Sequence, residues 1–269
     1  MILDPPLTTL FEDSALPRHE LPPALVDAYG GAIGFPRPCV YANFVASVDG
    51  VVALPDATES GHLISKSSRA DRFVMGLLRA CADTIVIGAG TFRKTHGALF
   101  RAEAIYPEGA AAFAELRARL GLAPTPRFVL VTRSGSVDTA EPALDGALLV
   151  TSRAGEQSLR GRVAATTEVV ALGADTVLLA DVMALLKKQG RTAILTEGGP
   201  SFFAEAVRAQ LVDELFVTTS PSLFGRYAND RRKSLAAGLD LGGVPLDLLG
   251  VKRHGSYLFL RYALTRSSP

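Results

Sequence analysis

Residues 191–207 read RTAILTEGGPSFFAEAV, and the rest of the chain is interpreted around the change from strand to helix that this segment predicts. The apolar run 192–195 predicts a buried strand. A helical pattern begins at Pro200, and proline suits the first turn of a helix. The two glycines before it let another group approach the backbone, and the unpaired N–H groups of a helix start attract anions. An isolated Gly-Gly-Pro is more simply a strand-to-helix turn, so an anion site here depends on the rest of the chain.

The size and composition of the chain limit its class. With 269 residues, 48% of them hydrophobic, the chain can form one large α/β domain or two small ones. A net charge of +1 without a basic cluster argues against a nucleic-acid surface. The start lacks the features of a signal peptide, and no stretch has the length of a membrane helix. We therefore expect a cytoplasmic protein with no nucleic-acid or membrane partner.

The chain has two cysteines, Cys39 and Cys81, which lie in apolar surroundings and are expected in the core. Two thiols form neither a disulfide framework nor a four-ligand zinc site. We expect no metal ion in this protein.

Strand and helix patterns alternate along the chain, as in an α/β protein with a mostly parallel sheet. The proline-rich residues 1–38 are expected to form an arm on the surface. The polar residues 226–243 are expected to form a mobile excursion. The expected strands are 40–48, 51–54, 84–87, 128–131, 147–151, 168–172, 192–195, 214–219 and 257–262, and the expected helices are 22–29, 65–82, 103–120, 176–188 and one beginning at residue 200.

Asp49-Gly50 closes the strand 40–48, and β-forming residues resume at once. An Asp-Gly between two such runs is the ordinary signal of a β-hairpin, in which Asp49 is a turn residue. The functional alternative is a carboxylate at a strand exit, beside the small hydroxyl of Ser47.

Serines and one arginine mark the start of the helix 65–82. Any of Ser65, Ser67 and Ser68 can cap this helix. Arg69 lies in the first turn, where a cation is unfavourable for the helix dipole, so we expect it to have an anionic partner. A surface salt bridge is the simple candidate, and a substrate phosphate is the functional one.

Gly88-Ala89-Gly90-Thr91 follows the continuous apolar strand 84–87. The dinucleotide fingerprint needs a third glycine where Arg93 stands, and no Gly-Lys-Ser/Thr follows at the spacing of a Walker motif. Both motifs therefore fail, and what remains is a glycine-rich strand exit.

Thr132-Arg133-Ser134-Gly135 follows the strand 128–131. An acid at such a strand end binds a ribose diol, whereas Arg and Ser favour a 2′-phosphate. The loop thus favours NADP over NAD if a nicotinamide cofactor binds, and is otherwise a solvated turn. Ligands bind at the carboxyl ends of parallel strands. If the strands are neighbours, loops 88–91, 132–135 and 197–201 converge on one elongated anion.

From about residue 38 to 265, the chain resembles the reductase half of the bacterial riboflavin-synthesis deaminase–reductase, which has a dihydrofolate-reductase-like fold. The TRSG loop and the proline-rich start are most similar to the stand-alone actinobacterial members. The motifs that carry the resemblance are ANFVASVDG at 42–50, Ser65 with Arg69, Arg79 with Asp83, Gly88–Thr91, Glu197–Pro200, Asp213-Glu214, and Pro221 with Gly225.

The resemblance implies a mostly parallel twisted sheet with helices on both faces and an antiparallel C-terminal strand. It implies one reductase domain over 38–265, after an arm over 1–37. The implied activity is hydride transfer from NADPH to the ribosyl carbon of a 5-amino-6-(5-phosphoribosylamino)uracil-like substrate, which gives the ribitylamino product. A homodimer is also implied, paired through a sheet edge at the strand 257–262.

The resemblance further implies roles for individual residues. Asp49, with Ser47, is expected to be catalytic, as a proton relay or substrate anchor. The expected substrate-binding residues are Ser65, Arg69, Leu99 and Arg101. The expected cofactor-binding residues are Ala42, Gly88, Gly90, Thr91, Thr132, Arg133, Ser134, Glu197, Gly198, Gly199, Pro200 and Ser201.

Two departures from the family pattern matter. The zinc deaminase signature, H-x-E with P-C-x-x-C, is absent, so the chain is not the bifunctional enzyme. Residues 94–101 read KTHGALFR where the family has an Asp-Pro-x-Leu segment; Leu99 and Arg101 correspond, but the acid is missing. His96 is then a substitute polar contact or a solvent-facing residue. The alternatives are an NADPH-dependent dihydrofolate or pterin reductase, and a non-catalytic NADP-binding protein.

Overall fold

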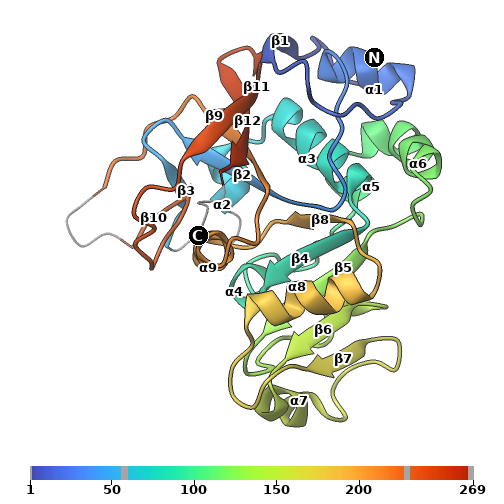
Figure 1. The fold of residues 1–269 in the computed structure, drawn as a ribbon, viewed down its shortest axis with the longest axis vertical. Helices are drawn as coiled ribbons and strands as arrows, with labels where there is room; N and C mark the ends of the chain where they lie inside the picture. Colours follow the sequence, from blue (N-terminus) through green and yellow to red (C-terminus); the bar gives the residue numbers. More distant parts are fainter. Residues whose placement is uncertain (1, 56–59, 227–230, 266–269) are drawn as a thin grey trace.

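The computed structural model describes residues 2–55, 60–226 and 231–265. Its main feature is a 10-stranded sheet in the order β1-β11-β12-β9-β2-β8-β4-β5-β6-β7 (Figure 1), and a small second sheet pairs β3 with β10. The strands are β1 Thr8–Glu12, β2 Cys39–Ser47, β3 Val51–Ala53, β4 Thr84–Gly88, β5 Arg127–Thr132, β6 Leu148–Thr151, β7 Glu168–Ala171, β8 Ala193–Thr196, β9 Glu214–Ser220, β10 Lys233–Ser234, β11 Leu246–His254 and β12 Tyr257–Leu264.

The strands from β9 to β7 are all parallel, and the middle of this half is buried on both faces. Alternate residues of a strand point to opposite faces. On β4, Ile85 and Ile87 therefore belong to one core cluster, and Val86 belongs to the other. This is why the sequence of β4 reads as a continuous apolar run.

Helices cover both faces of the parallel half (Figure 1). Helices α1, α3, α5 and α6 contribute to the core on one face, and α8 and α9 to the core on the other. The helices are α1 Pro23–Tyr29, α2 Ser60–Ile64, α3 Arg69–Cys81, α4 Ala89–Phe92, α5 Ala102–Ile105, α6 Ala110–Arg119, α7 Arg153–Leu159, α8 Leu179–Lys188 and α9 Pro200–Arg208, with 3-10 turns η1 Pro107–Gly109 and η2 Pro142–Leu144.

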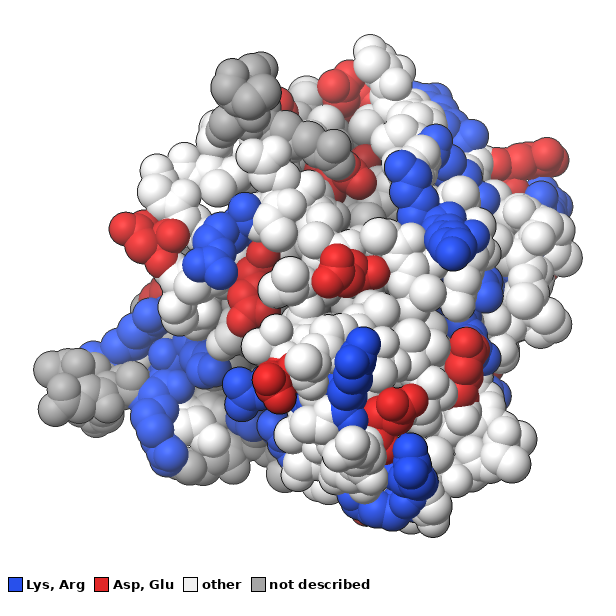
Figure 2. Space-filling model, turned by 60° about the horizontal axis from the view of Figure 1, so that its bottom comes forward, with Lys and Arg blue, Asp and Glu red and all other residues white. Residues whose placement is uncertain are grey.

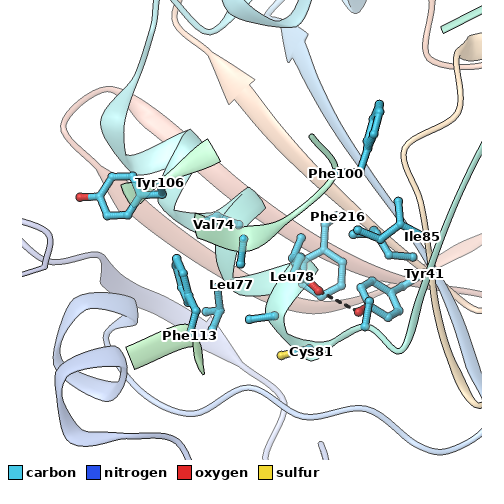
Figure 3. Close-up of a cluster of buried hydrophobic side chains, with 14 of the residues drawn as sticks. Tyr41, Val74, Leu77, Leu78, Cys81, Ile85, Phe100, Tyr106, Phe113 and Phe216 are labelled. Carbon is cyan, nitrogen blue, oxygen red and sulfur yellow. Dashed lines mark hydrogen bonds between the residues drawn. The ribbon is translucent and has the colours of Figure 1, made fainter. Parts of the chain in front are cut away.

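The larger core cluster joins α3 to the sheet (Figure 3). Leu77 and Leu78 of α3 are fully buried, and so is Phe113 of α6. Tyr41 of β2 is also fully buried, and its O–H donates a hydrogen bond to the carbonyl of Leu78 at 2.9 Å (Figure 3). This bond satisfies the buried hydroxyl and fixes the height of α3 against the sheet.

The other half of the sheet is antiparallel, and buried charges hold it together. Arg261 of β12 donates to both carboxylate oxygens of Glu214 at 2.7 and 2.9 Å, and to the carbonyl of Gly34 at 2.7 Å. Lys252 of β11 donates to the hydroxyl of Thr9 at 2.7 Å, which ties β1 to the sheet. These contacts attach the N-terminal segment to the C-terminal strands.

The predicted fold class is confirmed: a mostly parallel sheet, helices on both faces and an antiparallel C-terminal strand. Several details were wrong. The helix expected over 103–120 is interrupted at Pro107, because proline cannot continue a helix. Strands β1 and β11 and helix α7 were not predicted. Part of the excursion expected over 226–243, residues 227–230, lies outside the described residues; the rest contains β10, which pairs with β3.

Two further expectations need correction. The turn at Asp49-Gly50 exists, since the N–H of Gly50 donates to the carbonyl of Ser47 at 2.9 Å, but β3 pairs with β10 and not with β2 as in a hairpin. The proline-rich segment is no surface arm. It supplies β1 and several core residues, because its apolar side chains alternate with the prolines: Leu3, Leu7, Leu21, Leu25, Ile33 and Phe35.

Candidate functional site

The loops after β8, β4 and β5 lie side by side, because these strands are adjacent in the sheet. They border a cavity of about 1290 Å³. Ligand pockets usually measure about 300–1,000 Å³, so this cavity has room for two organic molecules. The predicted convergence of the three strand ends is confirmed, although Ser134 of the third loop does not line the cavity.

Glycines shape the wall formed by β4, β8 and α9. A Cβ atom on Gly198 would lie 2.4 Å from the ring of Phe202, and one on Gly199 would lie 3.0 Å from the hydroxyl of Thr91. The N–H of Gly198 donates to the hydroxyl of Thr196 at 3.2 Å. The glycines thus let α9 begin close to the loop after β4, which leaves the first N–H groups of α9 at the cavity wall.

A buried ion pair crosses the floor of the cavity. Arg79 of α3 donates to Glu197 through its Nη2 at 2.7 Å, and both side chains are only 7% exposed. Arg79 also donates to the carbonyls of Leu99 and Arg101, each at 3.3 Å. The pair therefore joins α3, the end of β8 and the loop before α5, and it occupies the carboxylate of Glu197.

Cationic side chains stand around the cavity. Arg133 follows β5 and is exposed. Lys233 of β10 donates to the hydroxyl of Ser201, at the start of α9, at 3.2 Å. Arg72 of α3 lines the cavity, and its buried Nε has no hydrogen-bond partner within the described chain. Figure 2 shows one face of the molecule, on which both acidic and basic side chains are present and basic ones lie together in places.

One acid faces the cavity from the first turn of α3. The backbone N–H of Asp71 donates to the Ser68 hydroxyl, which caps the helix, at 3.3 Å. Hydrogen bonding with the hydroxyl groups of Thr218 on β9 and of Ser65 favours the ionised form of Asp71. The Ser65 hydroxyl also donates to the carbonyl of His62 at 3.3 Å. Burial raises the pKa of Asp71 to about 6, although these hydrogen bonds and the charge of Arg72 act in the opposite direction.

Of the predicted site residues, eleven line the cavity: Ser65, Leu99, Gly88, Gly90, Thr91, Arg133, Glu197, Gly198, Gly199, Pro200 and Ser201. Seven do not: Ser47, Asp49, Arg69, Arg101, Ala42, Thr132 and Ser134. Ala42 and Thr132 are buried within their strands, and the hydroxyl of Ser134 accepts a bond from the N–H of Ser136 at 3.3 Å.

Asp49 and Ser47 serve the turn between β2 and β3 and lie away from the cavity lining. The hydroxyl of Ser47 donates to Asp49 at 2.5 Å, and the exposed carboxylate accepts from the N–H of Gly225 at 2.7 Å. The Ser47 hydrogen bond and the backbone N–H groups of Phe224 and Gly225 lower the pKa of Asp49. A carboxylate with a lowered pKa is a poor proton donor. The contacts of Asp49 are those of a turn residue, the first of the two alternatives.

Arg69 points away from the cavity and pairs with an acid on the protein surface. Its guanidinium lies 3.3 Å from the carboxylate of Glu108, and both side chains are about half exposed. It also donates to the hydroxyl of Tyr106 at 3.4 Å, which raises its pKa together with the charge of Glu108. The simple alternative, a surface salt bridge, is what the structure contains.

His96 lies in a smaller neighbouring cavity rather than in the main one. Its Nδ1 is 2.9 Å from Glu141, whose other oxygen accepts from the N–H of Gly97 at 2.7 Å. His96 therefore anchors the loop that replaces the Asp-Pro-x-Leu segment, and does not substitute for the missing acid.

The sequence reasoning missed several residues that line the cavity, above all Asp71 and Arg72 on α3 and Lys233 on β10. The signal for Asp71 was present but ambiguous, since an acid in a first helical turn also stabilises the helix dipole. Lys233 follows a segment that has no clear pattern, so no sequence signal placed it at the strand ends.

Within the described residues, no group of three or more His, Cys, Asp or Glu side chains could hold a metal ion. None of the helices in the described part of the chain has both the length and the apolar character needed to cross a bilayer.

A parallel sheet whose central strands end at a glycine-lined cavity is typical of α/β proteins that bind their ligands at the carboxyl ends of the strands. The sequence model described as the RibD C-terminal domain matches residues 38–256, so the chain belongs to this family. It is an oxidoreductase of the riboflavin-biosynthesis pyrimidine reductase type.

Individual proteins are similar to this chain in sequence or in fold. The chain is 28% identical over 192 residues, 70% of its length and 83% of the relative's, to the 2,5-diamino-6-ribosylamino-4(3H)-pyrimidinone 5′-phosphate reductase of Archaeoglobus fulgidus. Its fold is similar to that of a pyrimidine reductase-like protein from Corynebacterium diphtheriae, with a TM-score of 0.68, 22% identity, and coverage of 92% of this chain and 96% of that one. RibD of Acinetobacter baumannii gives a TM-score of 0.64 at 16% identity, over 90% of this chain and 60% of that one.

Proposed function

We propose that this protein is an NADPH-dependent reductase that converts a 5-phosphoribosylamino-pyrimidine into its ribitylamino product. The observation that carries the proposal is the meeting of three strand-end loops, with their glycines and Arg133, at one cavity of about 1290 Å³. The substrate ring is a uracil or, as in the name of the Archaeoglobus relative, a 2-aminopyrimidinone. Reducing the ring-opened sugar requires a hydride at C1′ and a proton on the attached nitrogen.

The residues at the cavity suit a dinucleotide with a 2′-phosphate. Gly88, Gly90 and Gly199 allow close approach to the backbone. The first N–H groups of α9 and the Lys233–Ser201 pair are suited to the pyrophosphate. Arg133 supports the preference for NADPH over NADH because its guanidinium can bind a phosphate at the end of β5. Bound NADPH supplies the hydride.

The substrate phosphate is assigned to α3. Arg72 replaces Arg69 in this role, because Arg72 lines the cavity and its buried Nε lacks a partner within the described residues. Ser65 and Leu99 also line the cavity and are kept as substrate-binding residues. Glu197 is held by Arg79 and lies in the cavity wall, between the regions assigned to the cofactor and to the substrate.

A steady-state assay tests the proposal. We expect NADPH oxidation with the phosphoribosylaminouracil or with its 2-amino counterpart, and much slower oxidation with NADH. Gly198→Ala should weaken NADPH binding, because its Cβ would meet the Phe202 ring at 2.4 Å. Gly250→Ala on β11, where the added Cβ would meet its nearest neighbour at 3.6 Å and which does not line the cavity, controls for glycine replacement as such. The absence of turnover with both pyrimidines would refute the proposal.

A second candidate substrate is dihydrofolate or another pterin, with the same fold and cofactor. A pterin site needs a carboxylate facing a ring with an amidine-like group, and Asp71 supplies a carboxylate in the cavity. Turnover of dihydrofolate without turnover of either pyrimidine would favour this candidate over the first.

We also propose a homodimer, but not through the strand 257–262 as an edge, because β12 is paired on both sides, with β11 and β9. The exposed Leu246 and Leu248 of β11, each 42% exposed, offer an apolar surface to a second copy. Light scattering at micromolar concentration should give twice the chain mass, and Leu248→Glu should shift it to the mass of one chain. A single-chain mass for the unmodified protein would contradict the dimer.

A further inference from the structure

Asp71 stands apart from the other acids of the cavity. In the described part of the chain, the cavity is lined by Asp71, Glu197 and Glu205. Glu197 is committed to Arg79, which binds both of its oxygens, and Glu205 is exposed on α9. Asp71 is partly buried, and the hydroxyl groups of Thr218 and Ser65 favour its ionised form. Among these three acids, Asp71 is thus the one that is partly buried and not held in an ion pair.

The charges that face Asp71 come from α3 itself and from the end of β8. Arg72 stabilises the ionised form, and Glu197 disfavours it, but Arg79 neutralises Glu197. Burial is the largest influence and brings the pKa of Asp71 to about 6. A carboxyl group with this pKa carries its proton in a useful fraction of molecules near neutrality, which suits a general acid.

We propose that Asp71 is the general acid of the reduction, and that Thr218 and Ser65 position its carboxyl group toward the cavity. This assignment depends on the proposed function. Opening of the ribose ring leaves a C1′=N double bond between the sugar and the pyrimidine amine. Asp71 donates its proton to this nitrogen, and the hydride with its electron pair adds to C1′. The double bond becomes the CH₂–NH of the ribitylamine, the nicotinamide is oxidised, and Asp71 is left as a carboxylate that solvent reprotonates.

The hydroxyl groups of Thr218 and Ser65 suit an acid that loses and regains its proton in each turnover. A hydroxyl can donate to the carboxylate after the transfer and accept from the carboxyl group before it. Thr218 and Ser65 can therefore hold the side chain in one orientation in both protonation states. A guanidinium partner, such as the one that holds Glu197, would stabilise the carboxylate alone and keep the proton off.

The first test compares Asp71→Asn with Asp181→Asn. Asp181 is an exposed acid in the first turn of α8, so its replacement removes the same charge from the same position of a helix, away from the cavity. We expect Asp71→Asn to lower kcat by about 100-fold or more with KM changed only a few-fold, and Asp181→Asn to change neither. In the unmodified protein, kcat should fall as the pH rises above about 6, and this limb should be absent from Asp71→Asn.

The second test does not depend on turnover. Carbon-13 NMR of the Asp71 carboxyl group should report a pKa near 6, and Thr218→Val should raise it further, because the hydroxyl that stabilises the charged form is lost. A measured pKa of about 4 or below, the ordinary range for Asp, would overturn the proposal.

The outcomes separate this proposal from the function on which it depends. Normal turnover by Asp71→Asn overturns the general-acid role and leaves the reductase function intact. A large increase of KM at unchanged kcat also overturns it, and makes Asp71 a substrate anchor. No turnover of either pyrimidine by the unmodified protein overturns the function and this step together.

Discussion

The two halves of the sheet use buried charge in opposite ways. In the antiparallel half, Arg261 binds Glu214 and the Gly34 carbonyl, while its guanidinium lies 5.0 Å from the Phe35 ring centroid. These contacts are all with the protein, and Arg261 does not line the cavity at the parallel strand ends. Around the parallel strand ends, by contrast, Arg72 has a buried Nε without a partner in the described chain.

This comparison separates two kinds of buried charged residue in this fold: those that stabilise the fold and those that are placed to bind a ligand. Burial alone does not separate the two groups, because Arg261 and Arg79 are both nearly inaccessible. What separates them is whether a cavity adjoins: Arg79 and Glu197 line one, and Arg261 and Glu214 do not. Each prediction below tests that distinction.

The largest effect is expected from breaking the two buried ion pairs. Arg261→Met and Arg79→Met each leave an uncompensated buried carboxylate, which should lower the free energy of unfolding by about 3–5 kcal/mol. Both losses can be measured by urea denaturation. Only Arg79→Met should also weaken NADPH binding in the folded fraction, because only Glu197 lies at the cavity.

Arg119→Met provides the control for these two variants. Arg119 pairs with Glu115 one helical turn away on the surface of α6, and this replacement should cost at most about 0.5 kcal/mol. If Arg261→Met weakened NADPH binding as much as Arg79→Met, the two halves would not be separate in function.

A smaller effect is expected from the pH dependence of Asp71. Its pKa is raised from 3.8 to about 6 on folding, so the folded state binds more protons between these values. Its contribution to stability is therefore present below about pH 4 and is lost as the pH rises through about 6. At pH 8, Asp71→Asn should be more stable than the unmodified protein by on the order of 1–3 kcal/mol, and denaturation curves across this range measure the difference. A variant less stable at every pH would show that the carboxylate serves the fold.

Arg133→Ala should weaken NADPH binding by about 1–3 kcal/mol, as for a lost charge-assisted contact, and leave NADH binding nearly unchanged. Arg160→Ala, at another exposed arginine that does not line the cavity, is the matched control. Titration calorimetry with both cofactors measures the difference. Equal losses for NADPH and NADH would remove Arg133 as the reader of the 2′-phosphate.

The smallest effect is expected at Glu141, which holds the loop 94–101 through His96 and the N–H of Gly97. These two bonds lower the pKa of Glu141. Its stabilising contribution is present above the ordinary pKa of Glu and is lost as the pH falls through the lowered value. Glu141→Gln should cost less than about 1 kcal/mol and raise KM for the pyrimidine slightly. An unchanged hydrogen-exchange rate at Gly97 would contradict this role.

The sequence predicted the parallel half well because its strands are buried on both faces. Ile85-Val86-Ile87 has no polar residue to hide the pattern, and the glycines before Pro200 mark the start of α9. The order of β8, β4 and β5 brought their loops together as expected. Periodicity and turn chemistry are local properties, so one sequence contains them.

The antiparallel half and the charged part of the site could not be predicted in this way. Residues 246–254 read LDLLGVKRH, which does not suggest a strand, because Lys252 is buried only through contacts with residues far away in the chain. Arg79 and Glu197 are 118 residues apart, and nothing local pairs them. Asp49 was expected to be catalytic because of the family resemblance and its place at a strand exit, and Asp71 was not considered, because which acid faces the cavity depends on how α3 is rotated.

The first 37 residues have a practical consequence for anyone who wishes to trim this protein. The family match begins at residue 38, which suggests a natural starting point for a shorter version. Such a version would leave the cation of Lys252 without the oxygens of Thr9 and Gly30, and would uncover the Phe216 ring that Phe35 now packs against. Truncation there should yield aggregates rather than a minimal enzyme.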